Sequence, residues 1–443
     1  MSAVDLARIQ FAVTTNAHFL FVVVTLGLAP LIAFMQLRWT VTGREVHERM
    51  TRFWGQIYVV NYALGIVTGI VMEFQFALNW TGISHVAGQV FGAPLALETI
   101  LAFFAEATFL GLWIFGWGRL PKWLHLGLFV LVTLTAYASA YWIMIANGFL
   151  QHPVGAVLSG TGRAATARIT DFAAMATNPN TVGALAHLLP AALFTGGMLV
   201  TAVSAYHLRR RTGRTWAERR RERPENEEFF VRSIRLGLLV ALPALVWTAI
   251  QGYVQFGYLG ADQPTKVAML GGSAAKAAAA AQAHMVAAHG PGAYLPPGWI
   301  SVPYAIMSAT AETFALPLLF LLPFVIRRWI VRRRILLKVL VWALPVPFVL
   351  VVCGWLVREV GRQPWVIYGV LRTTDAATPL STGTVAASLT VFSLLIGFLM
   401  LTDWLLMARL ARRGPRDLTL GASLAEVEAR EAGHPEPAYA RTI

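Results

Sequence analysis

Residues 354–365, GWLVREVGRQPW, place a glutamate and two arginines at the end of an apolar segment. Glu359 and Arg362 are three residues apart, so on a helix their side chains share a face. Ionisable groups at the end of a membrane helix are costly unless they face a protein interior, a partner ion or a cofactor. A carboxylate beside a cation suits a heme iron with its propionates, and a solvent-facing interfacial ion pair is the alternative interpretation.

Four further potential iron ligands occur in apolar segments of the chain. They are His18, Glu98, His187 and Met307. At 1.5 Å per residue, these four and Glu359 are predicted to lie within roughly 12 Å of one membrane surface. This layer predicts cofactors stacked along one face.

The ligand types divide into two kinds of heme site. A His–Met pair suits a low-spin, six-coordinate heme that transfers electrons. A His or Glu with a weak or open sixth position suits a heme that binds dioxygen. Taken singly, a membrane histidine is also compatible with hydrogen-bonded packing, and Met307 with filling of the core.

Glu106 follows Glu98 by eight residues, about 80° round a helix of 3.6 residues per turn, so both can face one interior channel. Near mid-membrane an isolated carboxylate favours protonation. The position predicts a proton relay from the cytoplasm, with Ser139 as a neighbour. A neutral acid hydrogen-bonded between helices is the alternative.

The composition requires these groups to be positioned by membrane helices. The chain is 57% hydrophobic and 13% charged, with a mean hydropathy of +0.60, which excludes a soluble globular domain. Apolar runs that are long enough to span predict an all-α bundle of about nine transmembrane helices. The runs lie at about 10–37, 54–75, 94–117, 124–147, 182–207, 235–256, 303–326, 336–357 and 386–408.

The net charge of +14 is distributed as in a membrane protein. Most Lys and Arg residues fall in alternate loops and in the C-terminal tail, which predicts an external N-terminus and a cytoplasmic C-terminus. The same distribution excludes nucleic acid as a partner and makes the lipid membrane the expected one. The N-terminus lacks a signal-peptide pattern, so we expect the first span to be retained.

The chain is predicted to form one membrane domain, residues 1–416, followed by a loosely ordered cytoplasmic tail, 417–443. Two external loops are long, 148–181 and 257–302, and the alanine run of the second predicts a short helix. The single cysteine, Cys353, excludes an intrachain disulfide and any cysteine-ligated iron–sulfur or zinc site.

The sequence resembles subunit I of the cytochrome bd family of terminal oxidases over nearly its whole length. Several long motifs occur in the family's order, which makes the match specific. They are LARIQFAVTTNAHFLFVVVTLGLA (6–29), FWGQIYVVNYALGIVTGIVMEFQFALNW (53–80), FGAPLALETILAFFAEATFLGLWIFGW (91–117), ANGFLQHP (146–153), GWLVREVGRQPW (354–365) and GPRDL (414–418).

The resemblance implies a ligand set for three hemes. His18 matches the axial ligand of one high-spin heme, and Glu359 matches the ligand of the other, with Glu98 nearby as a ligand or proton donor. His187 and Met307 match the axial pair of a low-spin heme b. The implied cofactors are low-spin heme b, high-spin heme b, and heme d or a further heme b.

The resemblance also implies roles for residues around the hemes. Glu106 and Ser139 match the cytoplasmic proton pathway, and Trp355 and Arg362 match the lining of the di-heme pocket. The implied quinol loop is 257–302, with contacts from residues that match the family there, Gln263 and Lys266.

As a whole, the resemblance implies the catalytic subunit of a quinol:oxygen oxidoreductase in the bacterial cytoplasmic membrane. Such an enzyme oxidises quinol at the outer face, reduces dioxygen to water with cytoplasmic protons, and so generates a proton-motive force. It is expected to form a heterodimer with a homologous subunit II, together with small single-span accessory subunits.

Three positions depart from the family's pattern. Gly271 replaces a quinol-site glutamate, Ala305 replaces an arginine, and Glu312 adds an acid. Glu312 is compatible with stabilising an oxidised heme, carrying a proton, or pairing with a cation on subunit II. These changes leave a second hypothesis open, a heme-bearing electron-transfer subunit with another donor or without oxygen reduction. A secondary transporter is a third, although no paired repeats are visible.

Overall fold

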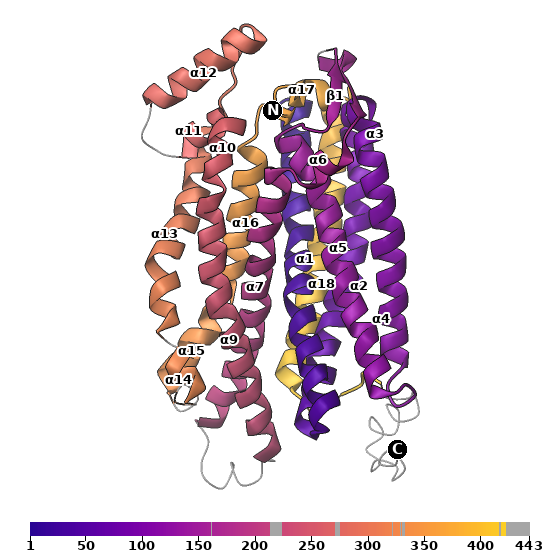
Figure 1. Ribbon diagram of the computed structural model, residues 1–443, viewed down its shortest axis with the longest axis vertical. Helices are drawn as coiled ribbons and strands as arrows, with labels where there is room; N and C mark the ends of the chain where they lie inside the picture. The colour runs from indigo at the N-terminus through magenta and orange to yellow at the C-terminus, as the bar shows by residue number, and fades with distance from the viewer. Residues whose placement is uncertain are drawn as a thin grey trace.

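The computed structural model describes residues 1–160, 162–212, 224–270, 275–320, 322–327, 329, 333–415 and 418–421. Gly271 and residues 422–443 of the predicted tail lie outside this set. Long helices run side by side along the longest axis of the molecule (Figure 1). The predicted all-α bundle is confirmed.

The chain forms long helices and several short helices that connect them. They are α1 (Ala3–Thr42), α2 (Glu45–Asn79), α3 (Thr81–Leu97), a π-helical segment (Glu98–Phe104), α4 (Ala105–Phe115), α5 (Lys122–Gln151), α6 (Phe172–Ala176), α7 (Pro179–Thr212), α9 (Pro224–Val254), α10 (Phe256–Asp262), α11 (Pro264–Leu270), α12 (Ala275–His289), α13 (Ser301–Leu319), α14 (Leu322–Ile326), α15 (Arg334–Trp342), α16 (Pro345–Val360), α17 (Thr373–Ala376) and α18 (Thr382–Arg413). Among the described residues, eight helical stretches are long and apolar enough to cross a membrane.

The remaining predicted span, 303–326, is divided between α13 and α14. Helix α13 carries Glu312 within this predicted span and is not one of the eight. The alanine run forms α12, as predicted. The chain is a multi-pass membrane protein.

Short β-hairpins occur in the loops at the end of the bundle that holds the N-terminus, here called the N-terminal end (Figure 1). Strands β1 (Ala156–Ser159) and β2 (Thr166–Ile169) pair antiparallel, with Ala156 opposite Ile169. Strands β3 (Trp365–Ile367) and β4 (Leu371–Arg372) pair antiparallel directly after α16. The segments α10, α11, α12 and α17 lie at the same end, whereas α18 finishes at the opposite one.

Local sequence explains where the first helix begins and ends. Ser2 and Asp5 form a capping box at the start of α1, because each side chain accepts a hydrogen bond from the other residue's backbone N–H. The helix ends at Gly43, whose φ of 63° is in the left-handed region that glycine adopts at little cost.

Glycines allow the central helices to pack closely. An added Cβ at Gly27 of α1 would overlap the Ala192 carbonyl of α7 and lie 2.8 Å from the backbone nitrogen of Gly196. On the other side of α7, an added Cβ at Gly197 would lie 2.7 Å from the carbonyl oxygen of Gly237 on α9. Small residues at such crossings let backbones approach where lipid gives no hydrophobic driving force. The helices α1, α7 and α9 therefore form the closely packed centre that positions the site.

We predict that Gly27→Ala destabilises the protein by about 1–3 kcal/mol, because backbone atoms fill the space that the new methyl group needs. Gly127→Ala on α5 is the matched control, since nothing lies within 4 Å of a Cβ there. Thermal unfolding of the two variants in the same detergent measures the difference. Equal midpoints would contradict the assignment of Gly27 to a tight crossing.

Candidate functional site

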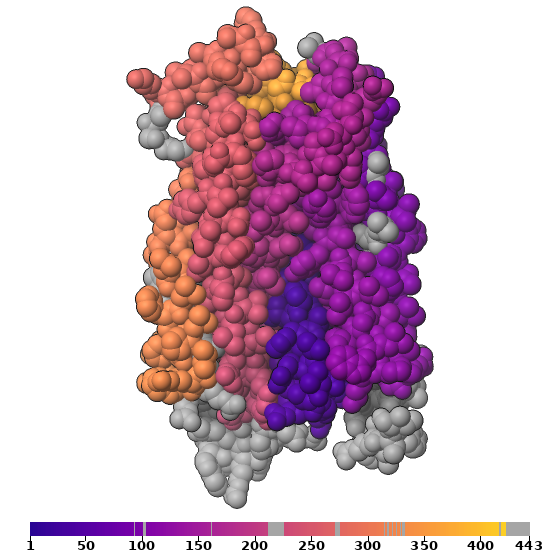
Figure 2. All heavy atoms as spheres, in the orientation of Figure 1, coloured from indigo at the N-terminus to yellow at the C-terminus, as the bar shows by residue number. Residues whose placement is uncertain are grey.

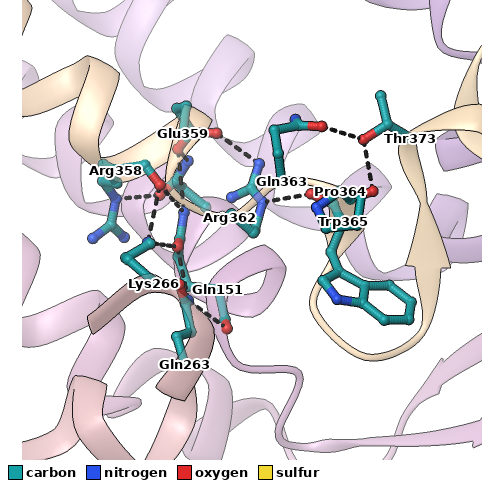
Figure 3. A network of polar contacts seen from close by, with 11 residues as sticks. Gln151, Gln263, Lys266, Arg358, Glu359, Arg362, Gln363, Pro364, Trp365 and Thr373 are labelled. Atoms are coloured by element: carbon teal, nitrogen blue, oxygen red, sulfur yellow. Dashed lines mark hydrogen bonds and ion pairs between the residues drawn. The ribbon is translucent and has the colours of Figure 1, made fainter. Parts of the chain in front are cut away.

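Glu359, in the last turn of α16, is buried in a hydrogen-bond network (Figure 3). Its Oε1 accepts from Asn147 Nδ2 at 2.8 Å and from Gln151 Nε2 at 3.3 Å. Its Oε2 accepts from Arg362 Nη2 at 2.6 Å. Glu359 is 8% exposed and Arg362 is 4% exposed, so the solvent-facing ion pair considered above is excluded. The pair faces the protein interior.

Two further basic side chains, Arg358 and Lys266, belong to the network around this carboxylate. Arg358 donates from Nε to Asn147 Oδ1 at 2.6 Å, and Lys266 Nζ donates to Gln151 Oε1 at 2.9 Å and to the Arg358 carbonyl at 3.0 Å. Burial lowers the pKa of Lys266 well below its ordinary value, and the nearby charges of Arg358 and Arg362 lower it further. With two always-charged arginines and one carboxylate, the network of Figure 3 has an excess of positive charge.

The two predicted quinol contacts belong to this same network. Lys266 is 2% exposed and Gln263 is fully buried. Gln263 Nε2 donates to both the backbone and the side-chain oxygen of Gln151, each at 2.8 Å. An added Cβ at Gly361 would lie 3.0 Å from Lys266 Cε, so the glycine leaves room for the lysine stem. These contacts attach the start of α11 to α5 and α16.

Several buried donors near Glu359 have no hydrogen-bond acceptor within the described part of the chain. They are Arg362 Nη1, Trp355 Nε1 and Trp365 Nε1. Buried donors are normally paired, so an anionic or carbonyl-bearing group fits beside them. Trp355 also stacks on Phe19, with ring centroids 4.9 Å apart, which brings α16 next to the residue that follows His18 on α1.

In both histidines that are predicted to bind heme, Nδ1 forms a hydrogen bond with another protein group. His187 Nδ1 lies 2.9 Å from the Thr248 carbonyl, which can only accept, so Nδ1 carries the proton. His18 Nδ1 lies 3.0 Å from Thr68 Oγ1, and that hydroxyl donates its own proton to the Gly65 carbonyl at 2.8 Å. In both rings Nε2 is left with a lone pair. This is the arrangement of a metal-ligating histidine that a second protein group orients.

A glycine faces each of three predicted ligands. An added Cβ would lie 3.1 Å from His18 Cε1 at Gly69, 3.3 Å from His187 Cε1 at Gly252, and 3.4 Å from the Met307 sulfur at Gly354. The neighbouring helices therefore leave the ligand side chains uncrowded. Within the described ranges no three His, Cys, Asp or Glu residues gather as a site for a bare metal ion. A heme needs only one or two ligands from the protein.

The two acids of the third span have separate partners. Glu98 opens the π-helical segment and accepts from Ser139 Oγ at 2.9 Å. Glu106 is buried on α4 and accepts from Tyr58 OH at 3.2 Å. Ser139 therefore binds Glu98, and the neighbour of Glu106 is a tyrosine of α2. A π-helical segment changes the register of side chains along the span and is common at functional sites.

Sequence reasoning missed several polar residues of this interior. Asn147 and Gln151 bind Glu359 and gave no signal beyond their positions in a matched motif. Arg358 was noted only as a charge at the end of the apolar segment, and it donates to Asn147. Asp403 on α18 is fully buried, and neither carboxylate oxygen has a partner in the residues that the structure describes. It is the single acid in the apolar run 386–408, so the sequence alone could have indicated a buried acid there.

The two described residues that depart from the family's pattern, Ala305 and Glu312, lie apart from this network. Glu312 is exposed on α13, where Tyr253 OH donates to its Oε1 at 2.5 Å. Ala305 is exposed on the same helix. Neither position contacts the Glu359 network through any hydrogen bond found among the described residues.

Comparisons with known proteins agree with this architecture. The family model for cytochrome bd terminal oxidase subunit I matches residues 6–308 and 290–415. Cytochrome bd ubiquinol oxidase subunit 1 of Bacillus subtilis is 33% identical, over 89% of this chain and 90% of that protein. Cytochrome bd-II ubiquinol oxidase subunit 1 of Escherichia coli is 30% identical, over 93% of this chain and 97% of that protein.

A solved structure shares the fold. The bd oxidase of Geobacillus thermodenitrificans superposes with a TM-score of 0.78, covering 93% of this chain and 99% of that chain at 23% identity. The family model, the sequence relatives and the shared fold lead to one conclusion: the chain is a divergent member of the cytochrome bd terminal oxidase subunit I family, an oxidoreductase family.

Proposed function

We propose that this protein is the heme-bearing catalytic subunit of a bd-type respiratory oxidase. It oxidises quinol at the N-terminal end of the bundle and reduces dioxygen to water with protons drawn from the opposite end. Quinol oxidation releases its protons on one side of the membrane, and the reduction of dioxygen to water consumes protons from the other side, so the reaction generates a proton-motive force. The N-terminal end is proposed to face outward and the C-terminus to face the cytoplasm of a bacterial cell.

The observation that carries the proposal is the state of the two intramembrane histidines. His18 and His187 each use Nδ1 for a protein hydrogen bond, and this directs an unprotonated Nε2 away from that partner. A packing histidine has no need of the same arrangement twice in one chain. Iron ligation does need it, because the metal binds the neutral nitrogen lone pair.

Three hemes are assigned to these residues. His187 and Met307 would hold a low-spin heme b, His18 would hold a high-spin heme b, and Glu359 would hold heme d or a further heme b. Glu98 is a second ligand or a proton donor at the same layer. When bound, the hemes supply electron transfer and the reduction of dioxygen.

The protein's own contribution near the hemes is charge and orientation. Arg362 holds Glu359 at 2.6 Å and keeps a second guanidinium nitrogen unpaired, which suits a propionate. Trp355, on the helix α16 that carries Glu359, offers an unpaired indole N–H. Asn147 and Gln151 fix the other carboxylate oxygen, so that Glu359 keeps one orientation.

Proton delivery is assigned to the acids of the third span and their hydroxyl partners. Tyr58 and Glu106 form the deeper pair, and Ser139 and Glu98 form the pair nearer the heme layer. A chain of groups that both donate and accept hydrogen bonds can pass a proton inward. The role of Glu106 is to hold and release that proton within the membrane.

The external segment 257–302 is proposed to form the quinol loop of the membrane domain, residues 1–416. Gln263 and Lys266 act in it as buried attachments to α5 and α16. At its far end Tyr294 stacks on Trp365, with ring centroids 5.7 Å apart, and Arg372 lies over the Tyr294 ring at 4.7 Å. The beginning of the loop is thus attached to α5 and α16, and its far end to the segment that follows Glu359.

The partners follow from the family. The protein is proposed to form a heterodimer with a homologous subunit II, and small single-span subunits complete the complex. Residues 417–443 are proposed to be a cytoplasmic tail.

A dithionite-reduced minus oxidised absorption spectrum of the purified complex tests this function, together with oxygen uptake. Low-spin b bands with a far-red chlorin band are expected for heme d, and b bands alone for a b-only variant. Hemes without oxygen uptake from an artificial reductant would instead indicate an electron-transfer subunit. Absence of all heme would refute the proposal.

We predict that His187→Ala and Met307→Leu each remove the low-spin heme signal. A high-spin heme that binds carbon monoxide after reduction should remain, because His18 and Glu359 are unchanged. Met198→Leu, a buried methionine of α7, is the matched control and should keep the full spectrum. Unchanged low-spin absorbance in both test variants would remove these residues from the ligand set.

We predict that Glu106→Gln slows oxygen reduction by about 100-fold or more with heme content preserved, since the amide cannot carry the proton. Tyr58→Phe should slow it less, because water can replace one hydroxyl. Tyr137→Phe is the control, as its hydroxyl donates to the Leu26 carbonyl outside this path. Oxygen uptake at saturating donor measures all three, and full activity of Glu106→Gln would exclude it from proton transfer.

A further inference from the structure

A short segment after α18, residues 418–421, packs into the bundle at the end opposite the N-terminal end. At that end α1 lies between α9 and the pair α4 and α5 (Figure 2), and α2 packs on α1. Leu420 is 7% exposed and belongs to the same apolar core as Trp113 of α4. An added Cβ at Gly55 of α2 would lie 2.9 Å from Leu420 Cδ2 and 2.7 Å from Trp113 Cη2. The leucine therefore fills the space between α2 and α4.

Polar groups of α2 hold this segment in place. The Gln56 and Thr419 side chains form a hydrogen bond. In the amide orientation that gives both of its ends a partner, Gln56 also accepts from the backbone N–H groups of Thr419 and Leu420, at 2.8 and 3.3 Å. Arg52 Nη1 donates to the Leu420 carbonyl at 3.1 Å, and Glu48 fixes Arg52 through an ion pair of 2.9 Å. Two successive turns of α2 thus bind the segment.

The other side of the segment contacts the residues that follow α4. Gly421 has a φ of 77°, in the region that glycine adopts at little cost, and an added Cβ there would overlap Trp117. The Arg52 guanidinium lies over the same indole, 4.4 Å from the ring centroid. Residues 418–421 therefore bridge the start of α2 and the end of α4.

The segment lies below the Tyr58–Glu106 pair, on the side from which protons are proposed to enter. Tyr58 follows Gly55 by three residues, or about 4.5 Å along α2. Trp113 follows Glu106 by seven residues, or about 10.5 Å toward the end of the bundle that carries the segment. Leu420, which packs at Gly55 and Trp113, therefore lies between the pair and that end.

An apolar layer separates the pair from the end of the bundle. The ring centroid of Phe129 lies 4.5 Å from that of Trp113 and 5.5 Å from that of Tyr58. The Trp113 indole N–H is already donated to Gln36 Oε1, at 2.8 Å. Side chains of this kind cannot pass a proton, which needs groups that both donate and accept. A proton therefore reaches Tyr58, which is fully buried, only if the layer opens.

The segment 418–421 is the part of the layer that can move without unwinding a helix. Trp113 and Phe129 lie within α4 and α5, whose backbones are held by continuous hydrogen bonds. The segment is anchored instead through Leu420, with Leu418 partly buried beside it, and through its contacts with α2. Short segments that bury little apolar surface open locally more readily than helices of the core.

We propose that residues 418–421 form a seal over the entrance of the proton path, and that protons reach Tyr58 and Glu106 when this segment leaves the bundle. Its departure admits water between α2 and α4. Gln56 and Arg52 are positioning residues that hold the seal closed. The inference rests on the proposed oxidase function and adds a gate to the path assigned to Glu106.

The test locks the seal with a chemical cross-link in the purified whole complex. Cys353→Ala serves as the parent, so that this chain has no other cysteine. Gln56→Cys and Thr419→Cys are combined, and a short bis-thiosulfonate linker joins them until a thiol cleaves it. Thr42→Cys with His47→Cys is the matched control, because that pair is in contact at 3.1 Å at the same end of the bundle. Each single-cysteine variant is treated with the linker as well.

Oxygen uptake is driven by a phenylenediamine with ascorbate, which leaves the linker intact, and the heme spectrum is recorded for each sample. Uptake by the cross-linked Gln56→Cys/Thr419→Cys complex should fall about 10-fold or more, since a step that must open the path then limits turnover. Thiol cleavage should restore it, with an unchanged heme spectrum throughout. The cross-linked control pair and the treated single variants should keep the activity of the parent.

Three outcomes would overturn the seal. Full uptake by the cross-linked complex would show that protons enter without movement of the segment. Loss of uptake in the untreated double variant, with its hemes intact, would make Gln56 or Thr419 part of the path itself. Failure of the linker to join the two cysteines would show that the segment does not dock on α2. Failure of the oxidase proposal is distinct, because a parent without diamine-driven uptake can still be cross-linked.

Discussion

Burial of charge at the end of α16 is the constraint on which the rest of the site depends. A carboxylate in a low-dielectric interior is tolerated only when hydrogen bonds and counter-charges replace its water. Glu359 meets this condition with Asn147 and Gln151 on α5 and Arg362 beyond α16. Those partners must stay in place, so α5, α11 and α16 are joined at one level of the bundle. The network thereby forms a rigid site from charged and polar side chains, each of which would destabilise the protein if it were buried without its partners.

The same constraint explains why polar groups occur in discrete pairs along the membrane interior. Each intramembrane acid of the third span has one hydroxyl partner, from Ser139 for Glu98 and from Tyr58 for Glu106. A serine or tyrosine hydroxyl can both donate and accept, so it satisfies either protonation state of the acid. Pairs of this kind permit proton movement without leaving a bare charge in lipid. Asp403, which lacks such a partner among the described residues, must be neutral or hydrated to remain buried.

The sequence was sufficient for most of the fold because hydrophobic length and charge bias are properties of single segments. It predicted the helical bundle and the short helix of the alanine run, and it placed His18 and His187 within membrane helices. It did not predict the hairpins β1–β2 and β3–β4, which depend on pairing between short polar segments. Nor did it predict that Ser139 binds Glu98. Glu98 opens a π-helical segment, and such a segment turns the side chains of the span away from the directions that an ideal helix of 3.6 residues per turn gives them. Which side chains of two helices meet depends on how the helices pack in three dimensions, and sequence spacing alone does not determine it.

The departure at Glu312 shows how position on a helix decides among roles that composition leaves open. Glu312 follows Met307 by five positions, about 140° round the helix, so its carboxylate does not share the direction of the Met307 sulfur toward α16. Stabilisation of a heme bound at Met307 by direct contact is therefore disfavoured. An acid retained on the bundle's outer surface needs a polar occupant, and Tyr253 satisfies only part of its capacity. The remaining capacity must be met from the membrane side, by a molecule that carries a hydroxyl or a cation there.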